Sequence, residues 1–339
     1  DGNKWNKIGA PEHSITFAPY NLGADPAYDT PKKQIEYLAT CSVTDAIKVY
    51  GDLYQWGRVA DGHEKRTSEK IPTNNNDSEE NGAITDVDAN GQPSSTSGAI
   101  GKFIKQYQTP QDWRSPQKDD LWGNGEGTVG QTDNQGGVLH TDGKYYQNTD
   151  WAIPANNPCT SMGAGWRVPT QDEWERLMNY DSNPSTAGGR VPVGTTNMPP
   201  TGQANTSANS APLTWIPVAG GKASNSWSGS QNELGGYAVY RTADWTSAIG
   251  ANGYFDDNGT PDYNRPLYAA AAPEPVLFFP AAGYRRAAGG SVNVTSKIGY
   301  YWSSTVNGII DYSFACDVTY LKFSQDSRAG GNSVRCVKE

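Results

Sequence analysis

Short apolar segments are spread over the whole chain of 339 residues, and long polar stretches separate them. Dense apolar and turn residues fill positions 5–56, and patterns typical of buried strands return at 276–285 and 318–323. The stretches between them are rich in Gly, Pro, Asn and Ser, which favour turns and loops. Since no repeat or isolating linker divides these segments, we expect one domain over all 339 residues, with insertions at about 63–149 and 181–266.

Most of these segments are short and lie between turn residues. This pattern predicts an α+β fold with short antiparallel strands, few short helices and long decorated loops. The clearest helix signal lies in the middle of the chain, where Thr170 and Glu173 have the spacing of a capping box. Because Trp174 and Leu177 then lie on one apolar face, we expect a helix that runs to about Asn179.

The charge balance argues against nucleic-acid binding, and the apolar content argues against a membrane-spanning helix. Acidic residues number 36 against 27 basic ones, which gives a net charge of −9. No window of about five to eight residues is rich in Lys or Arg, so the chain lacks the basic footprint of a nucleic-acid binder and no nucleic acid is expected as a partner. No stretch approaches the roughly 18 consecutive apolar residues of a membrane helix, so we expect no transmembrane segment.

The cysteines point to an oxidising compartment. Cys41, Cys159, Cys316 and Cys336 occur without the CxxC spacing of zinc or redox motifs. Structural disulfides in an exported protein explain this usage better than buried free thiols in a cytosolic one. We therefore expect an extracellular or cell-surface protein, although spacing alone does not tell which cysteines pair.

Separated motifs in a fixed order connect the chain to a known family. They are YGDLYQW at 50–56, Cys159 with GWRVPT at 165–170 and Glu173-Trp174, AGYR at 282–285, YWSST at 301–305 and SVRCV at 333–337. This set resembles the Fibrobacter succinogenes major paralogous domain family, whose members look like C-type-lectin folds of the formylglycine-generating-enzyme type. The resemblance covers about half the chain and leaves both insertions out.

The resemblance implies a disulfide between Cys159 and Cys336, because both lie within the family's motifs. Such a bond would tie the helix region to the terminal strand and close a very long loop. Cys41 and Cys316 stay open as alternative members of the disulfide network.

The resemblance also implies a use for the C-terminal region. Some lectin-fold proteins of this kind look like the variable proteins of diversity-generating retroelements, in which AAY codons are mutated toward NNY codons that never encode Met, Lys, Gln, Glu or Trp. Residues 308–320 contain none of these five, and the region 306–332 lacks the alternation of an ordinary strand. We therefore expect a variable binding region at 306–332. Its predicted ligand-binding residues are Asn307, Ile309, Ile310, Asp311, Tyr312, Phe314, Asp317, Thr319, Tyr320, Asp326, Ser327 and Asn332.

The residues give little support for catalysis. His13, His63 and His140 lie far apart, and no pair has the spacing that would place two imidazoles on one helix face. Neither a nucleophile elbow nor a phosphate-binding loop occurs in the sequence. We therefore expect a non-enzymatic, surface-displayed binding protein whose target is a protein or glycan on another cell or on a phage. An enzyme of the formylglycine-generating type and a structural or tip subunit of a surface appendage are the alternatives.

Calcium is the one cofactor that the sequence brings into question. Asp256, Asn258 and Asp262 surround a turn and could converge on an ion, and residues 86–91 resemble the first half of an oxygen-ligand loop. Ser97, however, stands where that loop needs a bidentate Glu. Solvated turns are the favoured interpretation of both segments, so no cofactor is expected and calcium is the alternative.

Overall fold

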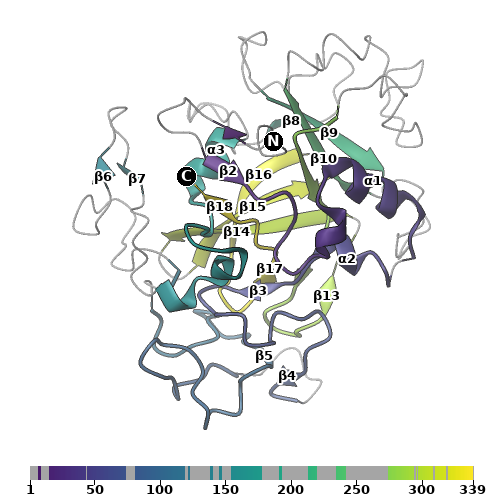
Figure 1. Cartoon of the computed structure of the whole chain (residues 1–339). Coiled ribbons are helices and arrows are strands. Elements are labelled where there is room, and N and C mark those ends of the chain that lie inside the picture. Colours follow the sequence, from purple (N-terminus) through teal and green to yellow (C-terminus); the bar gives the residue numbers. More distant parts are fainter. Residues whose placement is uncertain are drawn as a thin grey trace.

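The computed structural model describes residues 7–8, 15–42, 44–73, 81–118, 121–122, 138–139, 145–146, 154–177, 191–192, 213–219, 234–241, 274–293, 295, 297–307, 310–317 and 320–338 (Figure 1). The helices are α1 (Pro31–Thr40), α2 (Ile47–Tyr50) and α3 (Gln171–Leu177), with 3₁₀ turns η3 (Pro26–Tyr28), η4 (Pro154–Asn156) and η5 (Pro158–Met162). Among the described helices, none has the length and apolar character needed to cross a bilayer.

The strands are short and lie along the whole chain. They are β1 (Lys7–Ile8), β2 (Ile15–Phe17), β3 (Tyr54–Gln55), β4 (Lys70–Ile71), β5 (Phe103–Ile104), β6 (Val138–Leu139), β7 (Tyr145–Tyr146), β8 (Val191–Pro192), β9 (Leu213–Ala219), β10 (Leu234–Arg241), β11 (Leu277–Pro280), β12 (Tyr284–Arg285), β13 (Val292–Asn293), β14 (Ile298–Asn307), β15 (Ile310–Asp317), β16 (Tyr320–Asp326), β17 (Gly331–Asn332) and β18 (Val337–Lys338).

Small antiparallel sheets make up most of the frame. β14, β15, β16 and β8 form one sheet in that order, and β11, β10 and β9 form another. A third sheet has the order β13-β12-β17-β3, while β2 lies between β1 and β18, so that the beginning and the end of the chain meet. β4 and β5 pair in parallel. The predicted α+β class with short antiparallel strands and few short helices is thereby confirmed.

The predicted capping box is present at the start of α3. The Thr170 hydroxyl accepts from the Glu173 N–H at 3.2 Å, and the Glu173 carboxylate accepts from the Thr170 N–H at 2.8 Å. Glu173 also binds the guanidinium of Arg167 through both of its oxygens, at 2.7 and 2.5 Å. Local sequence therefore fixes where this helix begins, while its predicted end at Asn179 lies outside the described residues.

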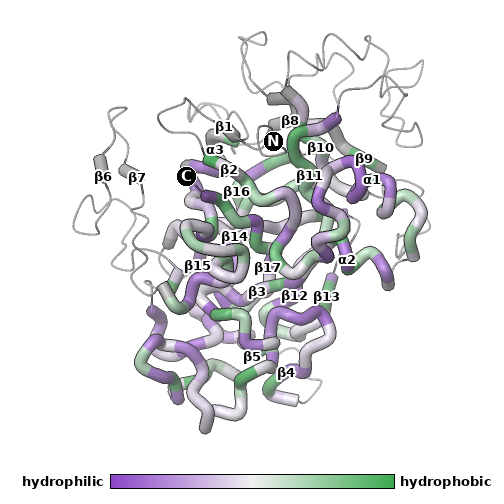
Figure 2. Tube along the Cα trace, viewed as in Figure 1, coloured by the Kyte–Doolittle hydropathy of each residue, from purple (hydrophilic) through white to green (hydrophobic). Residues whose placement is uncertain are grey.

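Aromatic side chains fill the space between α3 and the central strands. Trp174 of α3 stacks on Phe314 of β15 with ring centroids 4.9 Å apart. Phe279 of β11 and Tyr301 of β14 contact both of these rings. All four side chains have no exposed surface, and Figure 2 shows hydrophobic residues recurring along these central strands. Burial of such large rings is the main stabilising contribution to this part of the core.

The insertion at 63–149 is anchored to the frame by tryptophan. Trp113 and Trp122 are fully buried together with the framework residues Trp56 and Trp302. The indole N–H of Trp113 donates to the Trp56 carbonyl oxygen at 2.6 Å, so its polar group is satisfied inside the core. The described part of this insertion is therefore packed structure.

The segment 181–266 includes part of the frame, which corrects the expectation that it consists of decorated loops. Within it, β9 and β10 pair with each other, and β10 pairs with β11. Trp215 and Tyr237 of these strands are buried in the same aromatic cluster as Trp174. Gly, Pro and Ser in the flanks of these strands dominate the composition of the segment, so its overall composition does not indicate the two apolar strands.

Candidate functional site

In the described part of the C-terminal region 306–332, β14, β15 and β16 pair antiparallel in chain order, so this region is not the irregular patch that the sequence suggested. Phe314 of β15 pairs with Tyr301 of β14 and with Phe323 of β16, so these three side chains share the face that meets the core. That face carries odd-numbered residues on β14, even-numbered ones on β15 and odd-numbered ones again on β16. Because the parity changes at each turn, one window across the region shows no period of two.

Several predicted ligand-binding residues are buried, and the expectation that they contact a target is wrong for them. Phe314 lies in the aromatic core with no exposed surface, so it cannot act as an exposed anchor. Asp311 is equally buried and forms an ion pair with Arg328 at 2.6 Å. Asn332 is 2% exposed, and its amide donates to the Asp326 carboxylate at 3.2 Å. Framework contacts, and not ligand contacts, explain these polar residues.

The other predicted residues divide into two groups. Tyr312 and Ser327 are partly exposed and remain accessible to a target, whereas the carboxylate of Asp326 accepts hydrogen bonds from Ser313 and Asn332 inside the fold. The remaining predictions concern side chains or whole residues outside the described part of the chain: Ile309 and Thr319 entirely, and the side chains of Asn307, Ile310, Asp317 and Tyr320.

Two further residues of this sheet are accessible although the sequence did not assign them to a ligand. Gln325 of β16 is exposed and pairs directly with Tyr312 of β15, and Phe323 lies two residues earlier on the same face of β16. Phe323 packs against the core and is partly exposed. We call Tyr312, Phe323 and Gln325 the recognition surface. Alternation from the buried Leu321 onward was the signal that would have placed Phe323 and Gln325 together.

The opposite face of this sheet buries a group of carboxylates around one arginine. Arg328 binds Asp311 and also lies 3.6 Å from Asp112, and its guanidinium stacks over the Trp56 ring at 4.6 Å. Asp326 accepts a hydrogen bond from Ser313 on the neighbouring strand. Burial raises the pKa of Asp112 to about 6, because its effect outweighs the attraction of Arg328, which lowers this pKa. Burial also raises the pKa of Asp326.

The raised pKa of Asp112 predicts that the stability of the fold depends on pH. Asp112 holds a proton more tightly in the folded protein, with a pKa of about 6, than in the unfolded chain, where about 3.9 is usual. The folded state therefore binds more protons between these values, and its stability falls as the pH rises through them. We expect Asp112→Asn to gain up to about 3 kcal/mol relative to the parent protein between about pH 4 and pH 7.

Urea unfolding of both proteins across this range measures the effect. Glu36→Gln on α1 is the matched control, because its exposed side chain forms only a 4.0 Å pair with Lys32. A difference between Asp112→Asn and the parent that stays constant with pH would contradict the assignment.

A second titratable group, Asp61, His63 and Glu64, offers ligand atoms within 4.8 Å of one another. The His63 Nε2 accepts from the Gln55 N–H at 3.1 Å, and its Nδ1 lies 2.8 Å from the Asp61 carboxylate. The other oxygen of Asp61 binds Arg58 at 2.5 Å. Both ring nitrogens thus have partners, and the positive charge of the buried Arg58 beside Asp61 would repel a metal cation.

The pKa values of this group agree with a structural role. Burial, reinforced by the positive charge of Arg58, lowers the pKa of His63 to about 3, so the ring is neutral near pH 7. Burial alone would raise the pKa of Asp61, but the hydrogen bond from His63 and the charge of Arg58 hold it well below its usual range. A neutral histidine between fixed partners stabilises the turn and has no free nitrogen for catalysis or for a metal.

Of the calcium candidates, one segment is described. The Asp88 carboxylate accepts from the N–H groups of Asn90 and Gln92 at 2.8 and 2.9 Å, and the Asp86 carboxylate accepts from Ser94 at 2.5 Å. These bonds confirm the turn interpretation of residues 86–91. The second candidate group, Asp256, Asn258 and Asp262, lies outside the described residues.

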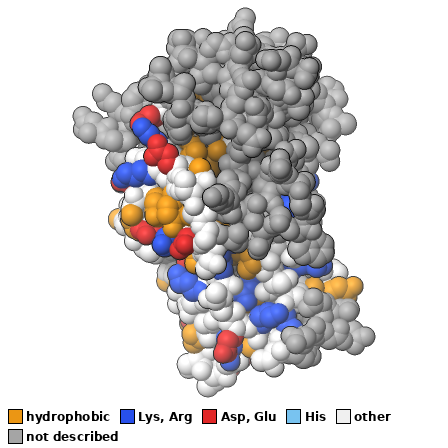
Figure 3. All heavy atoms as spheres, turned by 90° about the vertical axis from the view of Figure 1, so that its right-hand side faces the viewer, with side chains coloured by type: hydrophobic (Ala, Val, Ile, Leu, Met, Phe, Trp, Pro, Cys, Tyr) orange, Lys and Arg blue, Asp and Glu red, His pale blue; other side chains and the backbone are white. Residues whose placement is uncertain are grey.

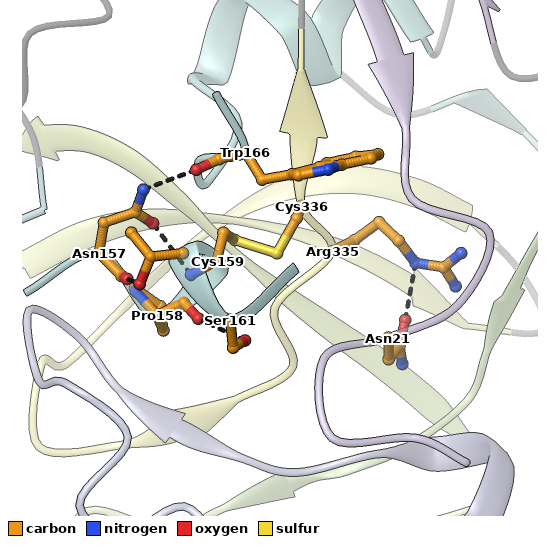
Figure 4. Close-up of a disulfide and its surroundings, with 9 residues drawn as sticks. Asn21, Asn157, Pro158, Cys159, Ser161, Trp166, Arg335 and Cys336 are labelled. Carbon is orange, nitrogen blue, oxygen red and sulfur yellow. Dashed lines mark hydrogen bonds between the residues drawn. A yellow bond between two sulfur atoms is a disulfide. The ribbon is translucent and has the colours of Figure 1, made fainter. Parts of the chain in front are cut away.

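The predicted disulfide is confirmed. Cys159 in η5 is bonded to Cys336, which immediately precedes β18, and both are fully buried (Figure 4). Asn157 supports η5, since its side chain accepts from the Cys159 N–H at 3.0 Å and donates to the Trp166 carbonyl oxygen at 2.7 Å. Cys41 and Cys316 are buried and form no disulfide, so they are not part of the disulfide network.

Comparison of the chain with family models, with curated proteins and with solved structures finds no match.

Proposed function

We propose that this chain is an exported, non-enzymatic binding protein of C-type-lectin-like fold, related to the Fibrobacter succinogenes major paralogous domain family. Its target is a protein or glycan on the surface of another cell or of a phage, and the recognition surface contacts it. One observation carries this proposal. Tyr312, Phe323 and Gln325 are accessible on two adjacent strands, while Phe314 and Leu321 of the same strands are buried in the core.

The packing beneath the recognition surface supports this role. Phe314 and Leu321 lie on the same face of the sheet as the recognition surface, two residues from Tyr312 and from Phe323, and both are fully buried. An aromatic or amide group held on such a sheet loses little conformational entropy when it binds a target. Partly exposed aromatic side chains supply large contact areas and are frequent energetic anchors of interfaces.

The Cys159–Cys336 disulfide supports the exported state. Disulfides form and persist in oxidising compartments and are rare in the cytosol. A protein displayed outside the cell would meet the surfaces of other cells and of phages, which is where we propose that its target lies.

The proposal includes diversification of the C-terminal region, but the buried residues limit the positions that can vary. Asp311, Phe314 and Asn332 have structural contacts, so free variation at these positions would destabilise the fold. Variation would be tolerated at Tyr312 and at other accessible positions. A reverse-transcriptase gene and a near-repeat of the codons for residues 306–332 beside the coding gene would support this part. Their absence would remove diversification from the proposal and leave the binding role standing.

Binding to arrays of glycans and to panels of intact cells and phages tests the proposed function. The Tyr312→Ala/Gln325→Ala variant should lose at least about tenfold in affinity for any target found, with an unchanged melting temperature. Ile47→Ala/Glu36→Ala on α2 and α1 is the control, because Ile47 is 46% exposed and lies on other elements. Equal binding by both variants, turnover of a substrate or a copurifying filament subunit would overturn the proposal.

A further inference from the structure

A second surface, far from the recognition surface in sequence, gathers positive charge in this acidic protein. Three segments, 65–70, 102–105 and 285–286, meet around the turn at 286–291. Their basic residues are Lys65, Arg66, Lys70, Lys102, Lys105, Arg285 and Arg286, and the acidic residues among and beside them are Asp52, Glu64 and Glu69. Seven positive charges thus meet three negative ones, although the chain as a whole carries −9.

Hydrogen bonds hold these segments together. Arg285 is buried, and its guanidinium donates to the carbonyl oxygens of Gly290 at 2.7 Å, Ser68 at 2.7 Å and Lys65 at 3.2 Å. The Lys70 ammonium donates to the Gly289 carbonyl oxygen at 2.9 Å. The basic side chains therefore lie on a fixed frame and are not scattered along a loop.

The stems of two lysines lie against one glycine of this turn. A Cβ atom on Gly290 would come within 2.7 Å of Lys70 Cδ and 3.3 Å of Lys105 Cγ, and the residue has a φ of +61° that favours glycine. Close approach of the two stems therefore depends on Gly290.

The cations differ in exposure. Lys65 and Lys102 have side chains that are 57% and 36% exposed; Lys65 pairs with Asp52 at 2.6 Å and Lys102 with Glu69 at 3.9 Å. Arg286 is exposed as well. Figure 3 shows Lys and Arg side chains gathered over the lower part of the face it presents, the region of β4 and β13 in Figure 1, with few acidic ones among them. We call Lys65, Lys70, Lys102 and Arg286 the basic surface. Its charges are spread over an open area, which suits a ligand with repeated negative charges.

We propose that the basic surface binds an acidic polysaccharide, a chain of sugars that carry carboxylate, sulfate or phosphate groups. Two neighbouring side chains fit this ligand, since Ile100 and Tyr107 are 50% and 47% exposed and could contact the apolar faces of sugar rings. The disulfide favours a polysaccharide over a nucleic acid, because acidic polysaccharides are abundant polyanions outside the cell. This inference concerns a surface separate from the recognition surface and does not depend on the proposed function.

Affinity measurements with named probes test the inference. Heparin and polygalacturonate serve as sulfated and carboxylated polysaccharides, dextran as an uncharged one and a short DNA duplex as the competing polyanion. We expect binding to at least one acidic polysaccharide, none to dextran, and a steep loss of affinity as salt rises from about 0.05 to about 0.5 M, since screening acts within about 10 Å.

Neutralising two exposed cations identifies the surface. Lys102→Gln/Arg286→Gln should lower the affinity for the bound polysaccharide about tenfold, which corresponds to about 1.4 kcal/mol. Lys32→Gln/Lys33→Gln on α1 removes the same charge elsewhere and should change it less than about twofold, and melting temperatures verify that both variants fold. No polysaccharide binding at low salt, equal losses in the two variants, or tighter binding to DNA would each overturn the inference.

Discussion

Replacing Cys159 and Cys336 together by Ser is expected to lower the free energy of unfolding by about 5 kcal/mol. The two half-cystines are 177 residues apart, so the bond removes a large amount of conformational entropy from the unfolded chain. Both sulfur atoms also lie in the core, where the new hydroxyl groups would have to find partners. A loss of this size is comparable with the whole stability of many domains.

The position of the disulfide adds to its effect. Cys336 lies between Arg335, whose guanidinium donates to Asn21 at 2.9 Å, and β18, which pairs with β2 (Figure 4). Arg167, shortly after η5, exchanges backbone hydrogen bonds with Val337 at 2.8 Å. The bond therefore joins the beginning, the middle and the end of the chain at one place.

Urea unfolding of the double Ser variant and of the parent protein under oxidising conditions measures the effect. Cys41→Ala is the control, because Cys41 is a free thiol that is 8% exposed at the end of α1. Equal unfolding midpoints for the parent and the double variant, or free thiols at Cys159 and Cys336 in the parent, would contradict the prediction.

Features with local or family-specific signals were predictable from the sequence. The capping box at Thr170 and Glu173 depends on two residues three positions apart, and both of its hydrogen bonds are present. The Cys159–Cys336 bond followed from motifs that the family resemblance placed together. In both cases the information lay in a few adjacent residues or in an ordered set of motifs.

Features that depend on distant partners were not predictable. Asp311 and Asp112 are ordinary polar residues in the sequence, but both meet Arg328, which is 17 residues from the first and 216 from the second. Hydrophobic pattern cannot distinguish a polar residue in water from one buried in an ion pair, so Asp311 was assigned to the ligand. Gln325 could have been placed on the same face as Phe323 by the alternation along β16, but nothing in the sequence indicated that it lies beside Tyr312.

Replacing Asp311 and Phe314 of β15 together by Ala is expected to have the second large effect on stability. Asp311→Ala would leave the Arg328 guanidinium buried without its closest partner, and breaking a buried pair in this way costs about 3–5 kcal/mol. Phe314→Ala would leave a cavity beneath Trp174, which costs about another 3–5 kcal/mol. The two residues lie on opposite faces of β15, so we expect the combined loss to approach the sum and to reach about 6 kcal/mol or more.

The matched variant on the same strands is Tyr312→Ala/Gln325→Ala. Tyr312 lies between the two buried residues in sequence, and Gln325 is its partner across the sheet. Since substitutions at exposed positions usually change stability by about 0.5 kcal/mol each, this variant should keep a melting temperature close to that of the parent. Urea and thermal unfolding compare the two variants directly.

If Asp311→Ala/Phe314→Ala folds as well as Tyr312→Ala/Gln325→Ala, then Asp311 and Phe314 are not framework residues and again become candidates for ligand contact. If both variants collapse, the recognition surface is itself structural, and the target must bind elsewhere on the protein.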